Sequence, residues 1–199
     1  MSEEEIKEKE KLLERIDELE SQVQKLEKDL IHDSLTKLKT RSFFEEEAKV
    51  YLDMAKNLEA GKRRQWFGFK NISFLFIDID HFKEVNDNFG HNTGDMVLKE
   101  VSDTIKKRVR MGDTVARWGG EEIVVSLLGA GLYDAEDKAE DIRKSIEELE
   151  FPAIPELKVT VSIGVVSSEK SDNFEEMIKN ADKAMYKSKE FGRNKVTVF

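Results

Sequence analysis

The sequence predicts an α+β fold, in which a mixed, mostly antiparallel central sheet is covered by helices and preceded by a long helix. Three observations indicate this. Helical and strand-like segments alternate along residues 32–199. Two strand-like runs flank Gly119-Gly120, and a two-residue glycine turn is a strong hairpin signal. Residues 1–31 repeat apolar positions at helical spacing and contain neither Pro nor Gly. We therefore expect two units, residues 1–31 and residues 32–199.

The first thirty residues are typical of a coiled coil. Their apolar side chains recur at alternating steps of four and three, at Leu12, Ile16, Leu19, Val23, Leu26 and Leu30. β-branched residues at position a with Leu at position d favour two parallel strands, so we expect a homodimer. The alternative is a single amphipathic helix docked on its own domain, but the apolar stripe is narrow and its surroundings are charged. About three heptads is short for independent pairing.

The middle of the chain predicts the centre of the sheet. Residues 32–41 are a polar link, and residues 42–58 have the apolar face of a helix, which Gly61-Lys62-Arg63-Arg64 ends. Residues 72–79 are a continuous apolar run rich in Phe and Ile, which is typical of a central strand buried on both faces. The polar stretch 81–91 has room for one or two helical turns.

The second half alternates in the same way. We expect helices over residues 93–108, 135–149 and 173–190, where apolar side chains follow a helical period. We expect strands over residues 114–118, 122–128, 158–166 and 195–198. This mixed order with one hairpin favours helices packed over a mostly antiparallel sheet.

The composition excludes several classes of protein. The 199 residues carry 33 basic and 42 acidic side chains, a net charge of −9, and no Cys. Disulfides, zinc-thiolate sites and thiol catalysis are therefore excluded. An acidic chain is a poor partner for polymeric nucleic acid or anionic lipid. There is no run of about 18 apolar residues to span a membrane, and the charged N-terminus does not resemble a signal peptide, so we expect a cytoplasmic location.

Carboxylates mark the candidate site. Asp78 lies at the end of the apolar strand, where a carboxylate is costly to bury unless it is paired or bound to a cation. Glu121 and Glu122 follow two glycines, which allow a close approach of backbone to ligand. Asp78, a backbone carbonyl and one of these glutamates would suit Mg²⁺. Taken singly, these residues also fit an ordinary strand end and a solvated turn.

A second group of polar residues fits nucleotide binding. An acid beside an amide can read the edge of a purine, and Lys can meet phosphate; such residues gather at Asp80, Lys83, Asn86, Asp87 and Asp95. Ordinary polar loops have a similar composition. Lys189 and Arg193, near the end of the last helix, fit either phosphate binding or the favourable placement of cations at a helix C-terminus.

At these residues the sequence resembles the GGDEF family, the diguanylate cyclases. The signature segment is Arg117-Trp118-Gly119-Gly120-Glu121-Glu122-Ile123. Further family elements occur in order, at Asp33 to Arg41, Asp78 to Lys83, Asn86-Asp87, Gly90-His91, Gly94-Asp95, Val161 to Val165, and Ala181 to Asn194. Together they span about four-fifths of the chain. The resemblance implies the nucleotidyl-cyclase-like fold for residues 32–199.

The resemblance also implies roles. Asp78, the backbone carbonyl of Ile79 and Glu121 would bind Mg²⁺, with Mn²⁺ as an alternative. Glu122 would position or deprotonate the attacking 3′-hydroxyl, and Asn86 and Asp95 would hydrogen-bond guanine. The triphosphate would be held beside Gly119 and Gly120 by Lys83, Lys189, Arg193 and the amides near His81 and Phe82.

Two departures from the family pattern need comment. Ile123 stands where the family usually has Phe; by strand alternation it shares a face with Glu121 and is expected to pack beside the site. Lys37 and Lys39-Thr40 stand where the family often has Gly and Pro-Asn, which affects the geometry of a turn. Both acidic signature residues are present, so we expect an active domain.

The implied reaction joins two GTP molecules into cyclic di-GMP and releases two pyrophosphates across a homodimer. Arg110 and Asp113 resemble the family's inhibitory R-x-x-D site for the product, and Arg143 is a candidate second contact from a neighbouring domain. Two other hypotheses stay open: a receptor for GTP or cyclic di-GMP that signals through its coiled coil without turnover, and a plain coiled-coil dimerisation protein.

Overall fold

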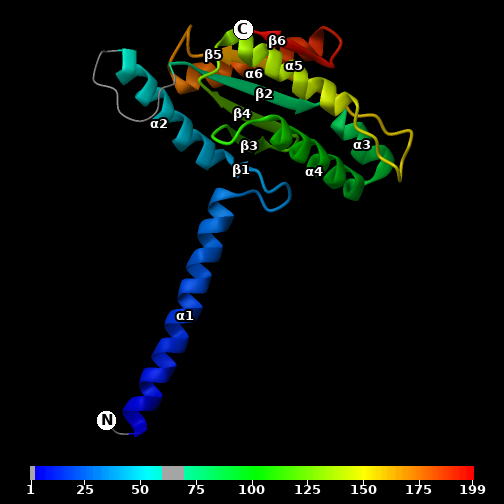
Figure 1. Ribbon diagram of the computed structural model, residues 1–199. Helices are drawn as coiled ribbons and strands as arrows, with labels where there is room; N and C mark the ends of the chain where they lie inside the picture. Colours follow the sequence, from blue (N-terminus) through cyan, green and yellow to red (C-terminus); the bar gives the residue numbers. More distant parts are fainter. Residues whose placement is uncertain (1–2, 60–69) are drawn as a thin grey trace.

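The computed structural model describes residues 3–59 and 70–199, and it has one long helix and one sheet-centred domain. Helix α1 (Glu3–Ile31) projects away from the domain as a rod (Figure 1). The predicted helix end at Gly61-Lys62-Arg63-Arg64 lies outside the described residues. Within the described ranges, no helix combines the length and apolar character needed to cross a bilayer.

The sheet has six strands in the order β1-β3-β4-β2-β5-β6. Their bounds are β1 (Lys39–Thr40), β2 (Ile72–Ile79), β3 (Thr114–Gly119), β4 (Glu122–Leu128), β5 (Val161–Ser167) and β6 (Lys195–Val198). β2 runs antiparallel to both of its neighbours, β4 and β5, while β1 and β6 join the edges in parallel. The predicted mixed, mostly antiparallel sheet is confirmed, and the predicted central strand is buried along its whole length.

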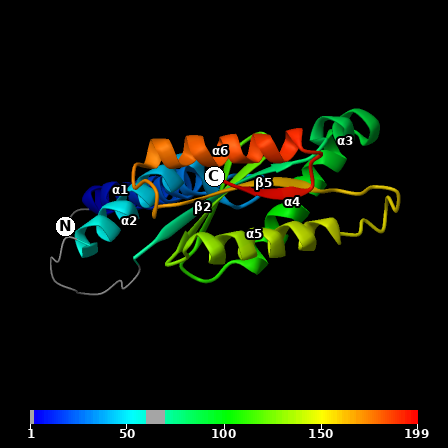
Figure 2. The ribbon, with the colours of Figure 1, turned by 90° about the horizontal axis from the view of Figure 1, so that it is seen from above.

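Helices cover both faces of the sheet (Figure 2). They are α2 (Arg41–Glu59), α3 (Phe82–Phe89), α4 (His91–Arg108), α5 (Leu132–Glu147) and α6 (Phe174–Glu190). α2 and α6 pack on one face around Phe74 and Phe76, whereas α3, α4 and α5 pack on the other around Leu75 and Ile77. Since alternate residues of β2 feed the two cores, a continuous apolar run is what this strand requires.

Two features differ from the expected elements. The link 32–41 contains the short strand β1, which pairs in parallel with β3 through Lys39 opposite Ala116. In the hairpin, Gly119 is the last residue of β3 and lies opposite Glu122, so Gly120 and Glu121 form the turn. The expected Gly119-Gly120 turn is therefore shifted by one residue. Glu121 precedes the strand, and the expectation that it shares a strand face with Ile123 was wrong.

Candidate active site

The end of β2 and the start of β4 place two acidic side chains on one face of the sheet. Asp78 lies directly opposite Glu122 in the antiparallel register, and both lie on the face covered by α2 and α6. Directly opposed residues have Cβ atoms about 5 Å apart. Glu121 stands in the adjoining turn, and the charges of Glu121 and Glu122 both act on Asp78. The sheet thus brings the three predicted carboxylates to one edge.

Lys189 of α6 supplies the counter-charge. Its Nζ lies 2.8 Å from Asp78 Oδ2, and the Asp78 side chain is only 7% exposed. Burial raises the pKa of Asp78 to about 6, although the Lys189 ammonium opposes this shift and the two glutamates add to it. A buried carboxylate that is hard to ionise gains from a further cation beside it. The Lys189 side chain is 28% exposed, which leaves it room to turn toward a phosphate.

Glu122 is held in an acidic and partly buried environment. Burial raises its pKa, and the charge of Asp182 on α6 adds to the effect. The neighbouring Gly119 makes room for it, because a Cβ at Gly119 would lie 3.2 Å from Glu122 Oε2. Glu122 also borders a pocket between α2 and α6 that Arg41, Trp118 and Asp182 help to line. Sequence reasoning assigned no role to Asp182, since only the packing of α6 on the sheet brings it to this point.

The signature turn is fastened to the segment that follows α1. The Arg117 guanidinium donates to the Gly120 carbonyl at 2.8 and 3.0 Å and to both carboxylate oxygens of Asp33 at 3.2 Å. Partial burial would raise the pKa of Asp33, but hydrogen bonds from Thr36 and the charge of Arg117 outweigh it and the pKa is lowered. Asp33 lies two residues after the end of α1. One side chain therefore connects the helix exit with the turn that carries Glu121.

The predicted base-reading residues lie together on α3 and α4. A Cβ at Gly94 would lie 2.0 Å from Asn86 Oδ1, so the Asn86 side chain rests against the first turn of α4 beside Asp95. Any larger residue at 94 would displace that amide. Asp95 and Lys83 are exposed, whereas the Phe82 side chain belongs to the core, which leaves only its backbone amide for a ligand. His81 adopts a left-handed conformation (φ 56°) at the start of α3 and contacts Glu84.

Asp80, by contrast, is a structural anchor. It is buried, and it accepts hydrogen bonds from Thr160 and Ser162 at 2.7 Å each and from the backbone N–H of Asn194 at 2.9 Å. With its oxygens committed in this way, Asp80 ties the end of β2 to the loop after α6. It does not join Asn86 and Asp95 as the sequence clustering had indicated.

The R-x-x-D segment lies away from these carboxylates, between α4 and β3. Asp113 accepts the backbone N–H of Arg110 at 2.9 Å and that of Leu128 at 3.1 Å, so its carboxylate shapes the turn. The Arg110 side chain is exposed. Arg143 lies elsewhere, on α5, where Glu140, Glu147 and Asn194 engage its guanidinium. A product contact by Arg143 would require it to leave these partners, and that role stays a prediction.

The residues present fit a divalent cation whose coordination is shared, with some ligand atoms from the protein and the others from a bound phosphate group. Within residues 3–59 and 70–199, no three His, Asp or Glu side chains converge closely enough to form a metal cage by themselves. Two carboxylates and a backbone carbonyl at one edge are instead the partial set that Mg²⁺ takes when phosphate oxygens complete its coordination. The buried Asp78 carboxylate, held against an ammonium, is suited to such a cation.

The fold, together with the carboxylates at the end of β2 and the start of β4, defines a nucleotidyl-cyclase-like domain. The family model "Diguanylate cyclase, GGDEF domain" matches residues 30–195. The chain belongs to the GGDEF family of diguanylate cyclases. Enzymes of this family use divalent metal ions, which agrees with the partial cation site.

Two curated relatives and two solved structures illustrate the likeness. Diguanylate cyclase A of Treponema denticola is 45% identical over 131 residues, covering 65% of this chain and 35% of the relative. Diguanylate cyclase VdcA of Vibrio cholerae is 34% identical over 185 residues, covering 91% of this chain and 50% of the relative. The chain thus spans half or less of these relatives.

The coiled coil and GGDEF domain of DgcB from Caulobacter crescentus, in complex with c-di-GMP, is similar over 100% of both chains (TM-score 0.83, 27% identity). Diguanylate cyclase SiaD with its activator SiaC, from Pseudomonas aeruginosa, covers 98% of this chain and is itself covered over 75% (TM-score 0.74, 28% identity). These likenesses confirm the predicted fold.

Proposed function

We propose that this chain condenses two GTP molecules into cyclic di-GMP with release of two pyrophosphates. The observation that carries the proposal is the pairing of Asp78 and Glu122 across β2 and β4, with Lys189 against Asp78 and Glu121 in the adjoining turn. In this arrangement Asp78 and Glu121 can hold a cation, and Glu122 can accept a proton. Both groups lie beside Lys189, which can bind phosphate. Family membership and relatives named as diguanylate cyclases support the same reaction.

The metal would be held by Asp78, the Ile79 carbonyl and Glu121. Mg²⁺, or Mn²⁺ in its place, would neutralise the phosphates and the charge that develops on the pyrophosphate leaving group. The chain's own part at this point is to keep Asp78 fixed and largely dry in the sheet, where its charge acts at full strength.

The remaining residues would bind and orient each nucleotide. Lys189, Lys83 and Arg193 would meet phosphate oxygens, together with the backbone N–H groups at the start of α3, where a helix N-terminus favours an anion. Asn86 and Asp95 would meet the guanine edge. Glu122 would accept the proton of the 3′-hydroxyl or orient it for attack on the other α-phosphate.

Turnover with GTP tests the proposal and its alternative. The protein is incubated with GTP and Mg²⁺, and the nucleotides are separated by chromatography. Cyclic di-GMP and pyrophosphate in a 1:2 ratio are expected. Bound GTP without product would support the receptor hypothesis instead, and neither binding nor turnover would leave a dimerisation protein.

Each domain would supply half of a two-fold symmetric reaction, so two domains must meet. We propose that residues 1–31 pair as a parallel coiled coil in front of a catalytic unit, residues 32–199. All six seam residues of α1 are exposed, from 44% for Leu19 to 71% for Leu30. Such a continuous apolar stripe gains by pairing with its copy, which raises the effective concentration of the second half-site.

Leu19→Lys is expected to weaken the dimer. A charge at a d position of a short coiled coil opposes pairing, so turnover per chain at low protein concentration should fall by about tenfold or more. Sedimentation velocity and a concentration series of turnover measure this. Glu14→Lys introduces the same side chain on the outer face of α1 and is the control. Equal turnover and equal mass in wild type and Leu19→Lys would remove α1 from the mechanism.

We further propose that cyclic di-GMP inhibits by binding at Arg110 and Asp113. The exposed Arg110 stands on a turn that Asp113 holds through its hydrogen bonds to two backbone N–H groups. The fork of a guanidinium suits a guanine edge or a phosphate.

Arg110→Ala is expected to weaken inhibition by cyclic di-GMP about tenfold or more while turnover without added product is kept. Initial rates at several product concentrations, with calorimetric titration of the product, provide the measurement. Equal inhibition of wild type and variant would place the product site elsewhere.

A further inference from the structure

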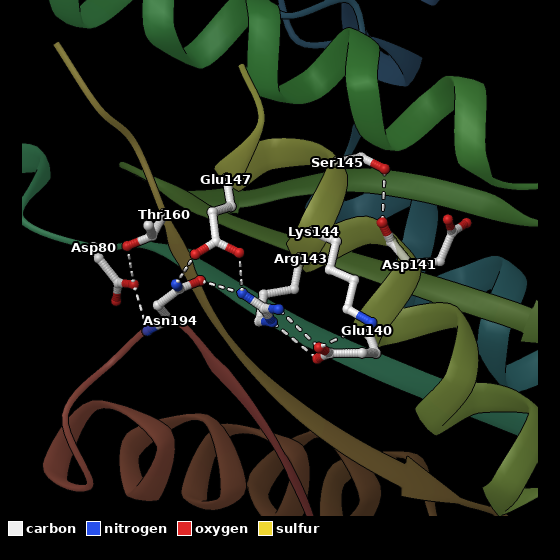
Figure 3. Close-up of polar contacts among 9 residues, drawn as sticks. All are labelled: Asp80, Glu140, Asp141, Arg143, Lys144, Ser145, Glu147, Thr160 and Asn194. Atoms are coloured by element: carbon white, nitrogen blue, oxygen red, sulfur yellow. Dashed lines mark hydrogen bonds and ion pairs between the residues drawn. The ribbon is translucent and has the colours of Figure 1, made fainter. Parts of the chain in front are cut away.

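Arg143 lies on α5, and its hydrogen bonds lead through Asn194 to Asp80, which directly follows β2 (Figure 3). Its guanidinium donates to Glu140 at 2.8 and 2.9 Å, to Glu147 at 2.8 Å and to Asn194 Oδ1 at 2.6 Å. The side chain is 11% exposed. A planar guanidinium can bond several acceptors at once in a fixed geometry, so Arg143 is held firmly by these three partners.

Asn194 carries the connection from α5 to the end of β2. Its side-chain amide donates to Glu147 at 2.7 Å, and its backbone N–H donates to Asp80 at 2.9 Å. Asp80 is itself fixed by Thr160 and comes two residues after Asp78. One hydrogen-bonded network therefore joins α5, the loop after α6 and the strand end that carries the predicted metal ligands.

The turn that carries Arg193 needs such support. Arg193 (φ 61°) and Asn194 (φ 46°) are consecutive non-glycine residues in the left-handed region, which side chains with a Cβ disfavour. A conformation of this kind persists only where surrounding contacts hold it. Here the backbone N–H of Arg193 donates to Ser188 at 2.9 Å, and Asn194 is clamped on its side chain and on its backbone.

We propose that Arg143 is a positioning residue for the GTP phosphates, which holds Asn194 and thereby keeps Arg193 at a fixed place relative to Asp78. The proposal rests on the proposed function, in which Arg193 meets the triphosphate. Arg143 acts from α5, on the sheet face opposite α6, and does not itself touch the nucleotide. Glu147 contacts both Arg143 and Asn194, so Arg143 and Glu147 together form a clamp on the Asn194 side chain.

A double-mutant cycle in the full chain tests whether Arg143 acts through Arg193. Arg143→Ala is expected to lower kcat/KM for GTP by about thirtyfold, mainly through KM, because a small misplacement of a phosphate contact is costly. In an Arg193→Ala background the same change should cost less than about threefold. Losses that simply multiply would mean that Arg143 serves general stability, and would overturn the proposal.

Glu147→Gln is the second variant, and it covers the case in which Arg143→Ala does not fold. It weakens the same clamp from a side chain that is 46% exposed, and it should follow the same pattern in the cycle. Glu148→Gln makes the same charge change one residue further along, on an exposed side chain, and should leave kcat/KM unchanged. A loss in Glu148→Gln equal to that in Glu147→Gln would overturn the assignment.

Amide hydrogen exchange separates this inference from the proposed function. Arg143→Ala and Glu147→Gln should each accelerate exchange at Gly192 to Asn194 by about tenfold or more, with exchange in β2 unchanged. Unchanged exchange at Asn194 in folded variants would overturn the clamp. If the two variants accelerate this exchange but the wild-type chain makes no cyclic di-GMP, the clamp is supported and the proposed function is overturned.

Discussion

Replacing Glu122 with Gln is expected to lower cyclic di-GMP formation by about a thousandfold, within the range for loss of a general base. Gln keeps the volume and the hydrogen-bonding reach of the side chain but can neither accept the proton of a 3′-hydroxyl nor offer it a negative charge. Because Asp78 lies opposite and Lys189 contacts Asp78, the phosphate side of the site should stay intact. GTP should therefore still bind.

The stability of Glu122→Gln separates catalysis from folding. Burial and the charge of Asp182 raise the pKa of Glu122, so the folded state disfavours its ionised form. When the pKa of a carboxyl is higher in the folded state than in the unfolded state, its protonated form stabilises the fold at low pH. This contribution to the free energy of unfolding is lost as the pH rises through the pKa of the folded state. At pH 7 a neutral Gln should thus leave the melting temperature equal or higher.

Product is measured by chromatography and Tm by calorimetry. Glu156→Gln, with the same charge change in an exposed loop, is the control and should keep full activity. Full activity in Glu122→Gln would exclude Glu122 from proton transfer. A lowered Tm would instead make the loss of product a folding effect.

The centre of the sheet could be predicted closely from the sequence. The bounds of β2 and β4 were predicted correctly, since a strand buried on both faces needs an uninterrupted apolar run. β1 was missed because Lys39 and Thr40 have no strand pattern, and only the exposed edge of β3 makes them a strand. The hairpin turn moved by one residue because β3 extends to Gly119, which pairs with Glu122 after a register shift between Arg117 and Gly119 that the glycine pattern does not indicate.

The residues of the candidate site could be predicted from the sequence, but the contacts between their side chains could not. The resemblance brought Asp78, Glu121, Glu122 and Lys189 together, but the contact of Lys189 with Asp78 depends on how α6 crosses the sheet. Asp80 was grouped with the base-reading residues because they are close in sequence. Its three partners come from residues about 80 and 114 positions away, which no local pattern reveals. For Arg143, Glu140 and Glu147 are close neighbours on α5, and only the contact with Asn194, 51 positions away, was hidden for the same reason.

Gly164 in β5 controls how closely α6 can approach the sheet, and its replacement by Ala is expected to cost about 3 kcal/mol or more of unfolding free energy. A Cβ at Gly164 would lie 2.0 Å from the Ala181 carbonyl oxygen and 2.3 Å from the Met185 nitrogen. Both are backbone atoms of α6, so no side-chain rotation can relieve the overlap. The helix must move away from β5 or the strand must bend.

The displacement of α6 should also reach the active site, because Lys189 lies one turn beyond Met185 on the same helix and contacts Asp78. Where Gly164→Ala still folds, kcat/KM for GTP should fall at temperatures well below its Tm. Urea unfolding and turnover at low temperature measure the two effects. Gly120→Ala is the control for stability, since a Cβ there meets no atom within 4 Å. An unfolding free energy of Gly164→Ala within about 0.5 kcal/mol of wild type would show that α6 is not seated on β5 in this way.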